Sequence, residues 1–316
     1  MNVTGGSQIE QNGGTGAVHQ ASETKRRRPT QAGLFVRAFL RRRSALVGSV
    51  VLLAVVVLAV FAPWLSPYRP SAQDLANRMQ PPSPSHPFGT DLYGRDVLSR
   101  IISGSRVSLA VGVISVVGAV ILGVACAGLA LTFRAADTIL MRGVDILMVF
   151  PPLLLAIAFV AALGPGLVNI SIAVGLATLP QFTRVARAEG LGILGATYVE
   201  AARAIGASKT RVMLKHVMRS IWPSIVVIAT LQVSNAVLLE ATLSFFGLGL
   251  SPPAASWGSM VSEGRAYLGL APWLSLFPGF FVLTTVLALN LVGDGLHDAL
   301  DPHLRSNLGA RGRSRS

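Results

Sequence analysis

Residues 107–133 (VSLAVGVISVVGAVILGVACAGLALTF) decide the fold class of this chain, because they run for 27 positions without a charged side chain. A hydrocarbon layer about 30 Å thick is crossed by roughly 20 apolar residues of helix. The 316-residue chain is 52% hydrophobic and 13% charged, whereas soluble domains carry about 25% charged residues. The sequence therefore predicts an all-α integral membrane protein. It argues against a soluble enzyme, a disordered chain and a disulfide scaffold.

Six segments of this kind are predicted to cross the membrane. The uncharged stretch 146–183 is too long for one span, and Gly164-Pro165-Gly166 near its middle is a strong turn pattern. The predicted spans are residues 45–65, 107–133, 146–163, 167–183, 221–246 and 272–292. Residues 35–303 would form the transmembrane domain, between a disordered N-terminal tail (1–34) and a basic C-terminal tail (304–316).

The distribution of positive charge predicts the orientation of these spans. With six spans, 21 of the 27 Lys and Arg residues fall in segments on the side of the N-terminus. Loops rich in Lys and Arg stay on the cytoplasmic side, so both termini are predicted to lie in the cytoplasm of a multi-pass plasma-membrane protein. The first apolar run exceeds the about 7–15 residues of a signal-peptide core, and no small-residue cleavage site follows it closely. We therefore expect an uncleaved first helix.

Motifs for catalysis, metal binding and phosphate binding are absent from the sequence. It contains no G-x-x-x-x-G-K-[ST] and no H-E-x-x-H, and its five His residues and Cys126 show no metal-ligand spacing. We expect no catalytic residue, no metal site and no cofactor in this chain. The only acid in the six predicted spans is Glu240, whereas ion-coupled carriers usually hold ionisable groups near the membrane midplane. Energy for uphill transport would therefore come from a partner.

The cytoplasmic stretch 198–220 has the pattern of two short helices. Small side chains dominate the first helix and allow close approach to a partner, Gly206 is suited to end it, and Ser208 is suited to cap the second. The second helix carries an apolar stripe at i, i+3, i+4 and i+7, formed by Leu214, Val217, Met218 and Ile221. This stripe predicts a helix at the membrane interface that runs into the fifth span. A solvated connector remains the alternative on these grounds alone.

Glu200-Ala201-Ala202, followed after three residues by Gly206, resembles the E-A-A-x-x-x-G signature of permease subunits of bacterial ABC importers. The resemblance implies that helix 198–207 docks on an ATP-binding subunit and transmits its movement. The docking residues that it implies are Glu200, Ala201, Ala202, Ala204, Gly206 and Ala207. The chain departs from the family pattern at Met218-Arg219, where relatives usually have Leu-Pro, so the bend into the fifth span stays open.

Further segments resemble the dipeptide, oligopeptide and nickel permeases of this type, specifically the second permease with a long N-terminal extension. They are residues 86–100 (HPFGTDLYGRDVLSR), 239–249 (LEATLSFFGLG), 256–258 (SWG) and 290–302 (NLVGDGLHDALDP). The resemblance implies a type I importer fold whose pathway is shared with a homologous second permease. It also implies two ATP-binding subunits, which hold ATP and Mg, and an extracytoplasmic substrate-binding protein. Peptides are the expected solute, with nickel or haem-type solutes as the alternative.

Two groups of outer residues are candidates for further roles. The first group consists of Thr90, Asp91, Gly94, Arg95 and Asp96. It could fold the loop through ion pairs, which we favour, or contact the binding protein. Glu240 could pair with Arg265, which we favour, or touch the solute. Asp137 and Asp145 are expected to anchor the inner end of the third span, and Pro151-Pro152 to kink it.

Other function classes make different demands on the sequence. A stand-alone carrier or channel would depend on Glu240 and the outer Asp residues, and a scaffold or assembly factor would form a complex without transport. The alanine-rich helix and the missing midplane charges favour the importer permease, which performs no chemistry itself. In a membrane protein a net charge of +13 reflects sidedness, so the expected surroundings are the lipid bilayer and no nucleic acid.

Overall fold

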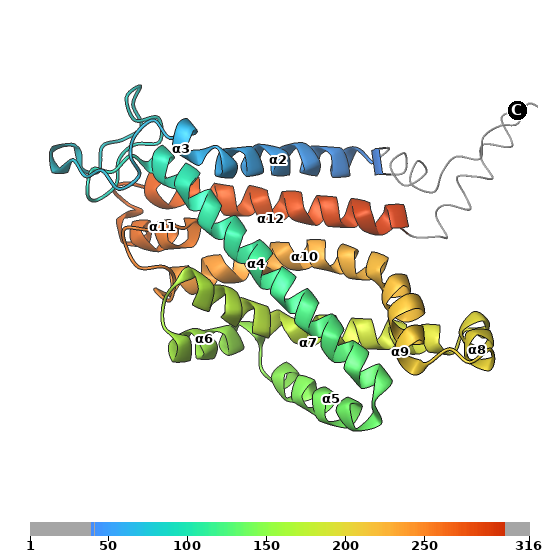
Figure 1. The fold of residues 1–316 in the computed structure, drawn as a ribbon. Helices are drawn as coiled ribbons and strands as arrows, with labels where there is room; N and C mark the ends of the chain where they lie inside the picture. Colours follow the sequence, from blue (N-terminus) through green and yellow to red (C-terminus); the bar gives the residue numbers. More distant parts are fainter. Residues whose placement is uncertain (1–38, 41, 301–316) are drawn as a thin grey trace, which may run out of the picture.

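The computed structural model describes residues 39–40 and 42–300, and within them it is a bundle of helices without a strand (Figure 1). The predicted tails, 1–34 and 304–316, lie outside the described residues. The long helices are α2 (Arg43–Val60), α4 (Val97–Thr132), α5 (Arg134–Val149), α6 (Pro152–Leu163), α7 (Leu167–Leu194), α10 (Met218–Phe245) and α12 (Trp273–Leu300). The short ones are α3 (Ala62–Leu65), α8 (Thr197–Ala204), α9 (Lys209–Val212) and α11 (Trp257–Gly264), with a π-helix at Met213–Val217.

Four of the described helices are long and apolar enough to cross a membrane: α2, α4, the continuous helix Lys209–Phe245 that contains α10, and α12. The pair α5–α6 makes a fifth if it counts as one span bent by 100°. The prediction of six spans is therefore not confirmed. α6 alone has 12 residues, about 18 Å of helix, and α7 carries Gln181, Arg184 and Arg187 in its second half.

Proline and glycine set the breaks around α6. Pro151 and Pro152 end α5, because proline is excluded from a helix interior but accepted in its first turn. The predicted kink is thus a complete break between two helices. The predicted turn between α6 and α7 is confirmed, since Gly164 (φ +83°) and Gly166 (φ +140°) adopt left-handed conformations that favour glycine.

Small residues let the long helices pack closely. α4 lies along α7, where a Cβ on Gly123 would be 2.8 Å from the Cβ of Phe182. α2 lies along α12, where a Cβ on Gly48 would be 2.8 Å from the Cβ of Leu291. Close backbone approach at small residues is the usual way in which membrane helices associate. The bundle is therefore held by helix contacts along its whole length.

The two ends of the bundle differ in what they carry (Figure 1). One end, here called the loop end, holds the segment 66–96 and α11. The other, here called the α8 end, holds α8 and α9. These two ends contain the residues that the sequence singled out.

Candidate functional site

A buried ion cluster at the loop end joins the start of α4 to α11. Arg95 Nε donates to Asp91 Oδ2 at 2.6 Å, and Arg100 donates both to Asp91 and, at 2.8 Å, to Glu263 Oε2. Arg95 Nη2 also reaches Glu263, at 3.1 Å. The Arg100 side chain is only 2% exposed. Two guanidinium groups and two carboxylates thus neutralise one another, which buried charges require.

Asp96 lies beside this cluster and has a separate role as the N-cap of α4. Its Oδ2 accepts hydrogen bonds from the backbone N–H and the hydroxyl of Ser99, at 2.8 and 2.7 Å, and so caps α4. Its Oδ1 lies 2.9 Å from His86 Nδ1. The cap explains why α4 begins ten residues before the predicted span at 107, because the helix continues out of the apolar region to reach it.

Thr90 and Gly94 complete the same folded unit. The Thr90 hydroxyl donates to the carbonyl of Asn77 at 2.5 Å and accepts from the Gln80 N–H at 2.8 Å. Gly94 has a φ of +70°, and a Cβ there would collide with the carbonyl of Asp74. The five predicted loop residues therefore lie together and bond within the chain. Their contact with a binding protein stays a prediction.

Glu240 and Arg265 are not brought together. Glu240 is fully buried in α10, where its Oε1 accepts a hydrogen bond from the Ser244 hydroxyl at 2.8 Å. Arg265 is exposed and lies over the ring of Phe245, 5.2 Å from its centroid. The favoured ion pair is therefore not formed, because the carboxylate lies inside the helix packing while the guanidinium stays at the surface. The same burial removes Glu240 from contact with a solute in this conformation.

α8 projects from the opposite end of the molecule (Figure 1). Val199 is the one buried residue of α8. The helix is joined to the bundle through α7 before it and α9 after it. Glu200, Ala201 and Ala204 are exposed, and Ala202 is half-buried. Ile205, directly after the helix, is 88% exposed. α8 therefore presents an exposed face of small and apolar side chains, and its docking on another protein stays a prediction.

Gly206 ends α8 in the manner expected. It has a φ of +90°, its N–H bonds to the carbonyl of Arg203 at 2.9 Å, and the Ala207 N–H bonds to the carbonyl of Ala202 at 3.0 Å. This pair of bonds is the Schellman motif, which places glycine at the left-handed position. The Ser208 hydroxyl then accepts from the Arg211 N–H at 3.3 Å and caps α9, as predicted.

The segment after α9 corrects one sequence prediction. Leu214 was predicted on the apolar stripe, but it is 67% exposed, and its neighbour Met213 is buried instead. The reason is the π-helix at Met213–Val217, whose wider turn shifts the register of the side chains. The π-helix lies directly before Met218-Arg219, where the sequence departs from the family pattern. The π-helix thus connects α9 to α10.

Comparison with known proteins assigns the family. Residues 119–306 match the family model described as binding-protein-dependent transport system inner membrane component, and residues 30–82 match the N-terminal TM domain of oligopeptide transport permease C. The chain belongs to the binding-protein-dependent transport permeases. A putative peptide transport system permease protein of Brucella suis biovar 1 is 45% identical over 272 residues, which cover 86% of this permease and 92% of the relative. The glutathione transport system permease protein GsiD of Salmonella typhimurium is 42% identical over 273 residues, which cover 86% and 90%.

The membership makes this permease a multi-pass inner-membrane protein of the ABC importer class, and its relatives are transport components.

Two acids of α5 form ion pairs with the neighbouring α7. Arg187 binds Asp137 through two bonds of 2.6 and 2.8 Å, and Arg184 binds Asp145 at 2.7 Å. Both acids were predicted to anchor this region. Because α7 leads directly to α8, the pairs join α5 to the base of the projecting helix.

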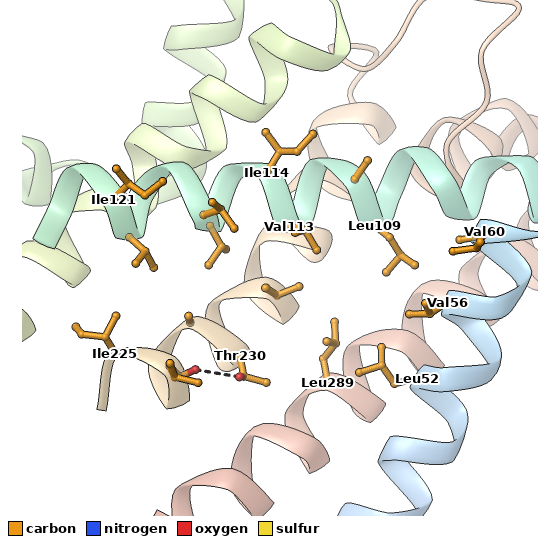
Figure 2. Close-up of a pocket in the computed structure, with 18 of the residues that line it drawn as sticks. Leu52, Val56, Val60, Leu109, Val113, Ile114, Ile121, Ile225, Thr230 and Leu289 are labelled. Carbon is orange, nitrogen blue, oxygen red and sulfur yellow. Dashed lines mark hydrogen bonds between the residues drawn. The ribbon is translucent and has the colours of Figure 1, made fainter. Parts of the chain in front are cut away.

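An apolar groove runs along another face of the permease, between α2, α4 and α10 (Figure 2). Its volume is about 860 Å³. Figure 2 shows its walls, with side chains such as Val56, Val113 and Ile225 turned toward the space. The hydroxyl of Thr230 is already bonded to the Val226 carbonyl, at 3.0 Å. This groove suits hydrocarbon and offers nothing to a polar solute.

Sequence reasoning missed two members of the ion cluster. Arg100 stands inside the quoted segment 86–100 but was not singled out, and Glu263 lies 163 residues further along the chain. A signal for Glu263 was present, because it is the one acid between residues 247 and 271, on the side where Arg95 and Arg100 are predicted to lie. The pairing of Glu263 with Arg100 could be recognised only in the folded structure, which brings the two residues together.

Proposed function

We propose that this chain is one of two permease subunits of an ATP-driven importer of peptides. It would cross the membrane six times, with α5–α6 as one bent span and α7 as another, and with both termini in the cytoplasm. The two permeases would enclose the pathway between them. Two ATP-binding subunits, which hold ATP and Mg, would dock beneath, and an extracytoplasmic binding protein would deliver the solute.

The exposed face of α8 is the observation that carries this proposal. The helix has the E-A-A-x-x-x-G pattern, closes in a Schellman motif and leaves Glu200, Ala201 and Ala204 free. It is attached at its two ends, and the ring of Tyr198 lies 6.0 Å from that of His216 in the following π-helix. A movement applied to α8 can therefore pass both to α7 and to α10.

The charges at the two ends support the proposed orientation. At the α8 end five basic side chains are exposed, and within the described residues none of them makes an ion pair: Arg203, Lys209, Arg211, Lys215 and Arg219. At the loop end Arg95 and Arg100 are neutralised by acids, and fewer basic side chains, such as Arg69 and Arg265, are exposed without an ion pair in the described structure. Unpaired positive charge is retained on the cytoplasmic side, and this supports a cytoplasmic location for α8, where ATP-binding subunits could reach it.

Peptides are the proposed solute because of the relatives. Relatives of similar length and sequence include peptide and glutathione permeases, and glutathione is itself a small peptide. A stand-alone carrier based on Glu240 is disfavoured, because that carboxylate is fully buried.

The docking role is tested by adding bulk and charge to α8 in the complete importer. Ala204→Arg should abolish co-purification of the ATP-binding subunits and peptide uptake, because the added side chain keeps the helix from docking on the ATP-binding subunit. Ala135→Arg is the matched control, since Ala135 is an exposed alanine of α5 near the same end. It should assemble and transport as the unchanged importer does. Normal assembly and uptake with Ala204→Arg would contradict the proposal.

A further inference from the structure

Three amide side chains meet halfway along α7 and α10. Gln232 of α10 donates to Gln181 of α7, and Asn235 donates to Gln232 Oε1 at 3.1 Å. Gln232 is buried, whereas Gln181 and Asn235 are exposed at the surface of the chain. Gln232 lies near the middle of α10 (Met218–Phe245), roughly 20 Å of helix from either end. We call these three residues the amide cluster.

Exposed amides at this depth are incompatible with lipid. A polar group in hydrocarbon without a hydrogen-bond partner carries a large free-energy cost, and polar residues of membrane helices therefore face protein or water. The groove between α2, α4 and α10 shows what a lipid-compatible face of this chain looks like, since its walls are apolar (Figure 2). The face with Gln181 and Asn235 is polar, and it therefore does not suit contact with lipid.

The same face continues toward the α8 end with charges. Arg184 lies three residues after Gln181, which puts both on one side of α7. Arg184 pairs with Asp145 of α5, and the two side chains are 50% and 57% exposed. An exposed ion pair next to the amides points to water along this face, from the α8 end up to the middle of the bundle.

The hydrogen bonds within the cluster leave both a donor group and an acceptor group for a ligand. The bonds run from Asn235 through Gln232 to Gln181. Within the described part of the chain, the Nε2 of Gln181 and the Oδ1 of Asn235 have no further partner. One end thus offers a donor and the other an acceptor, which is what the C=O and N–H of a peptide backbone need. Such a site would form no hydrogen bonds that depend on the side chains of the peptide.

We propose that the amide cluster lines the translocation pathway and binds the backbone of the passing peptide. This rests on the proposed function and adds to it a place where this chain itself contacts the solute. Recognition of backbone groups would accept peptides of many sequences. It would leave selection among them to other parts of the importer.

Cysteine labelling in the complete importer tests the proposal. In a Cys126→Ala background, Asn235→Cys and Gln181→Cys should react with a water-soluble, membrane-impermeant thiol reagent added from the cytoplasmic side of inverted vesicles. Leu283→Cys is the control, because Leu283 of α12 is 62% exposed on an apolar surface. A thiol in apolar surroundings is a poor nucleophile, so labelling at 235 should be about tenfold faster than at 283. Trialanine or glutathione, supplied during transport, should slow labelling at 235.

The outcomes separate this proposal from the proposed function. If the Cys126→Ala importer takes up either peptide but positions 181 and 235 label no faster than 283, the amide cluster faces lipid or a closed subunit interface and the proposal is overturned. Fast labelling without peptide protection would overturn peptide binding by the cluster. If the same importer takes up neither peptide while labelling at 235 remains fast, the error lies in the proposed solute, and a protecting solute of another class would replace the peptide.

Discussion

The loop end and the α8 end of this permease both carry many charged residues, but within the described residues only the loop end holds a buried cluster of them that is paired. At the loop end Asp91, Arg95 and Arg100 are buried and paired. At the α8 end basic side chains such as Arg203 and Lys209 are exposed and unpaired within the described residues. The ion cluster of the loop end is therefore complete within one chain, whereas the α8 end presents surface and charge that the chain does not use itself.

The backbone shows the same difference. Segment 66–96 is fixed by contacts with distant parts of the chain, such as the bond from Trp273 Nε1 to the Thr90 carbonyl at 3.3 Å. α8 is fixed mainly by the Schellman motif at its C-terminal end and by the buried Val199. The first arrangement favours rigidity, and the second lets a helix be moved by a partner while it stays folded.

The largest effect should come from breaking the buried cluster. Arg100→Ala leaves Asp91 and Glu263 short of a positive charge in a buried site, which should lower the free energy of unfolding by about 3–5 kcal/mol. Denaturant unfolding of the purified chain in detergent measures this loss. Arg69→Ala is the control, because Arg69 is exposed at the same end and forms no ion pair in the described structure. Equal losses in both variants would mean that the cluster does not hold the loop end.

A smaller loss of stability but a clear loss of function is expected at Gly206. Valine at this left-handed position costs about 1–2 kcal/mol of backbone strain, although no atom lies within 4 Å of the new Cβ. The end of α8 should shift, so that the importer still hydrolyses ATP while peptide uptake falls. ATPase and uptake assays on the same vesicles measure the two separately.

Gly192→Val provides the comparison for Gly206. Gly192 also has open space around a Cβ but lies in regular helix near the end of α7. Its variant should keep uptake coupled to hydrolysis. Uptake at the normal rate in Gly206→Val would remove α8 from the coupling route.

The smallest effect is expected at Leu214. Since this side chain is 67% exposed, Leu214→Ala should change the free energy of unfolding by no more than about 0.5 kcal/mol. Met213→Ala, one residue earlier and buried, should cost about 2 kcal/mol or more. Thermal unfolding of the two variants in the same detergent compares them. A larger loss at 214 than at 213 would restore the regular helix that the sequence predicted.

Local patterns carried most of what the sequence could predict. The glycines at 164, 166 and 206 and the cap at Ser208 act within a few residues of themselves, so their roles could be inferred without the fold. The apolar runs likewise predicted α2 and α10 closely. Residue patterns of this kind also led to α8 and to the loop residues 90–96.

What the sequence could not predict depends on contacts between distant segments or on a change of helix type. Glu263 joins Arg100 only when α11 packs on α4. Glu240 was expected to meet Arg265, but the packing of α10 takes its side chain inward. The π-helix takes Leu214 out of the stripe, because the spacing i, i+3, i+4 and i+7 assumes the period of an α-helix.

A crosslink from α8 in native membranes would show directly whether α8 docks on an ATP-binding subunit. Ala204→Cys in a Cys126→Ala background, treated with a short bifunctional thiol–amine reagent, should yield a product with a protein that carries the phosphate-binding loop of an ATP-binding subunit. Tyr93→Cys, at an exposed position of the loop end, should give no product with that protein. A crosslink to the ATP-binding subunit from 93 instead of 204, or none from 204 in a membrane that imports peptide, would contradict the claim that the α8 end is the docking end.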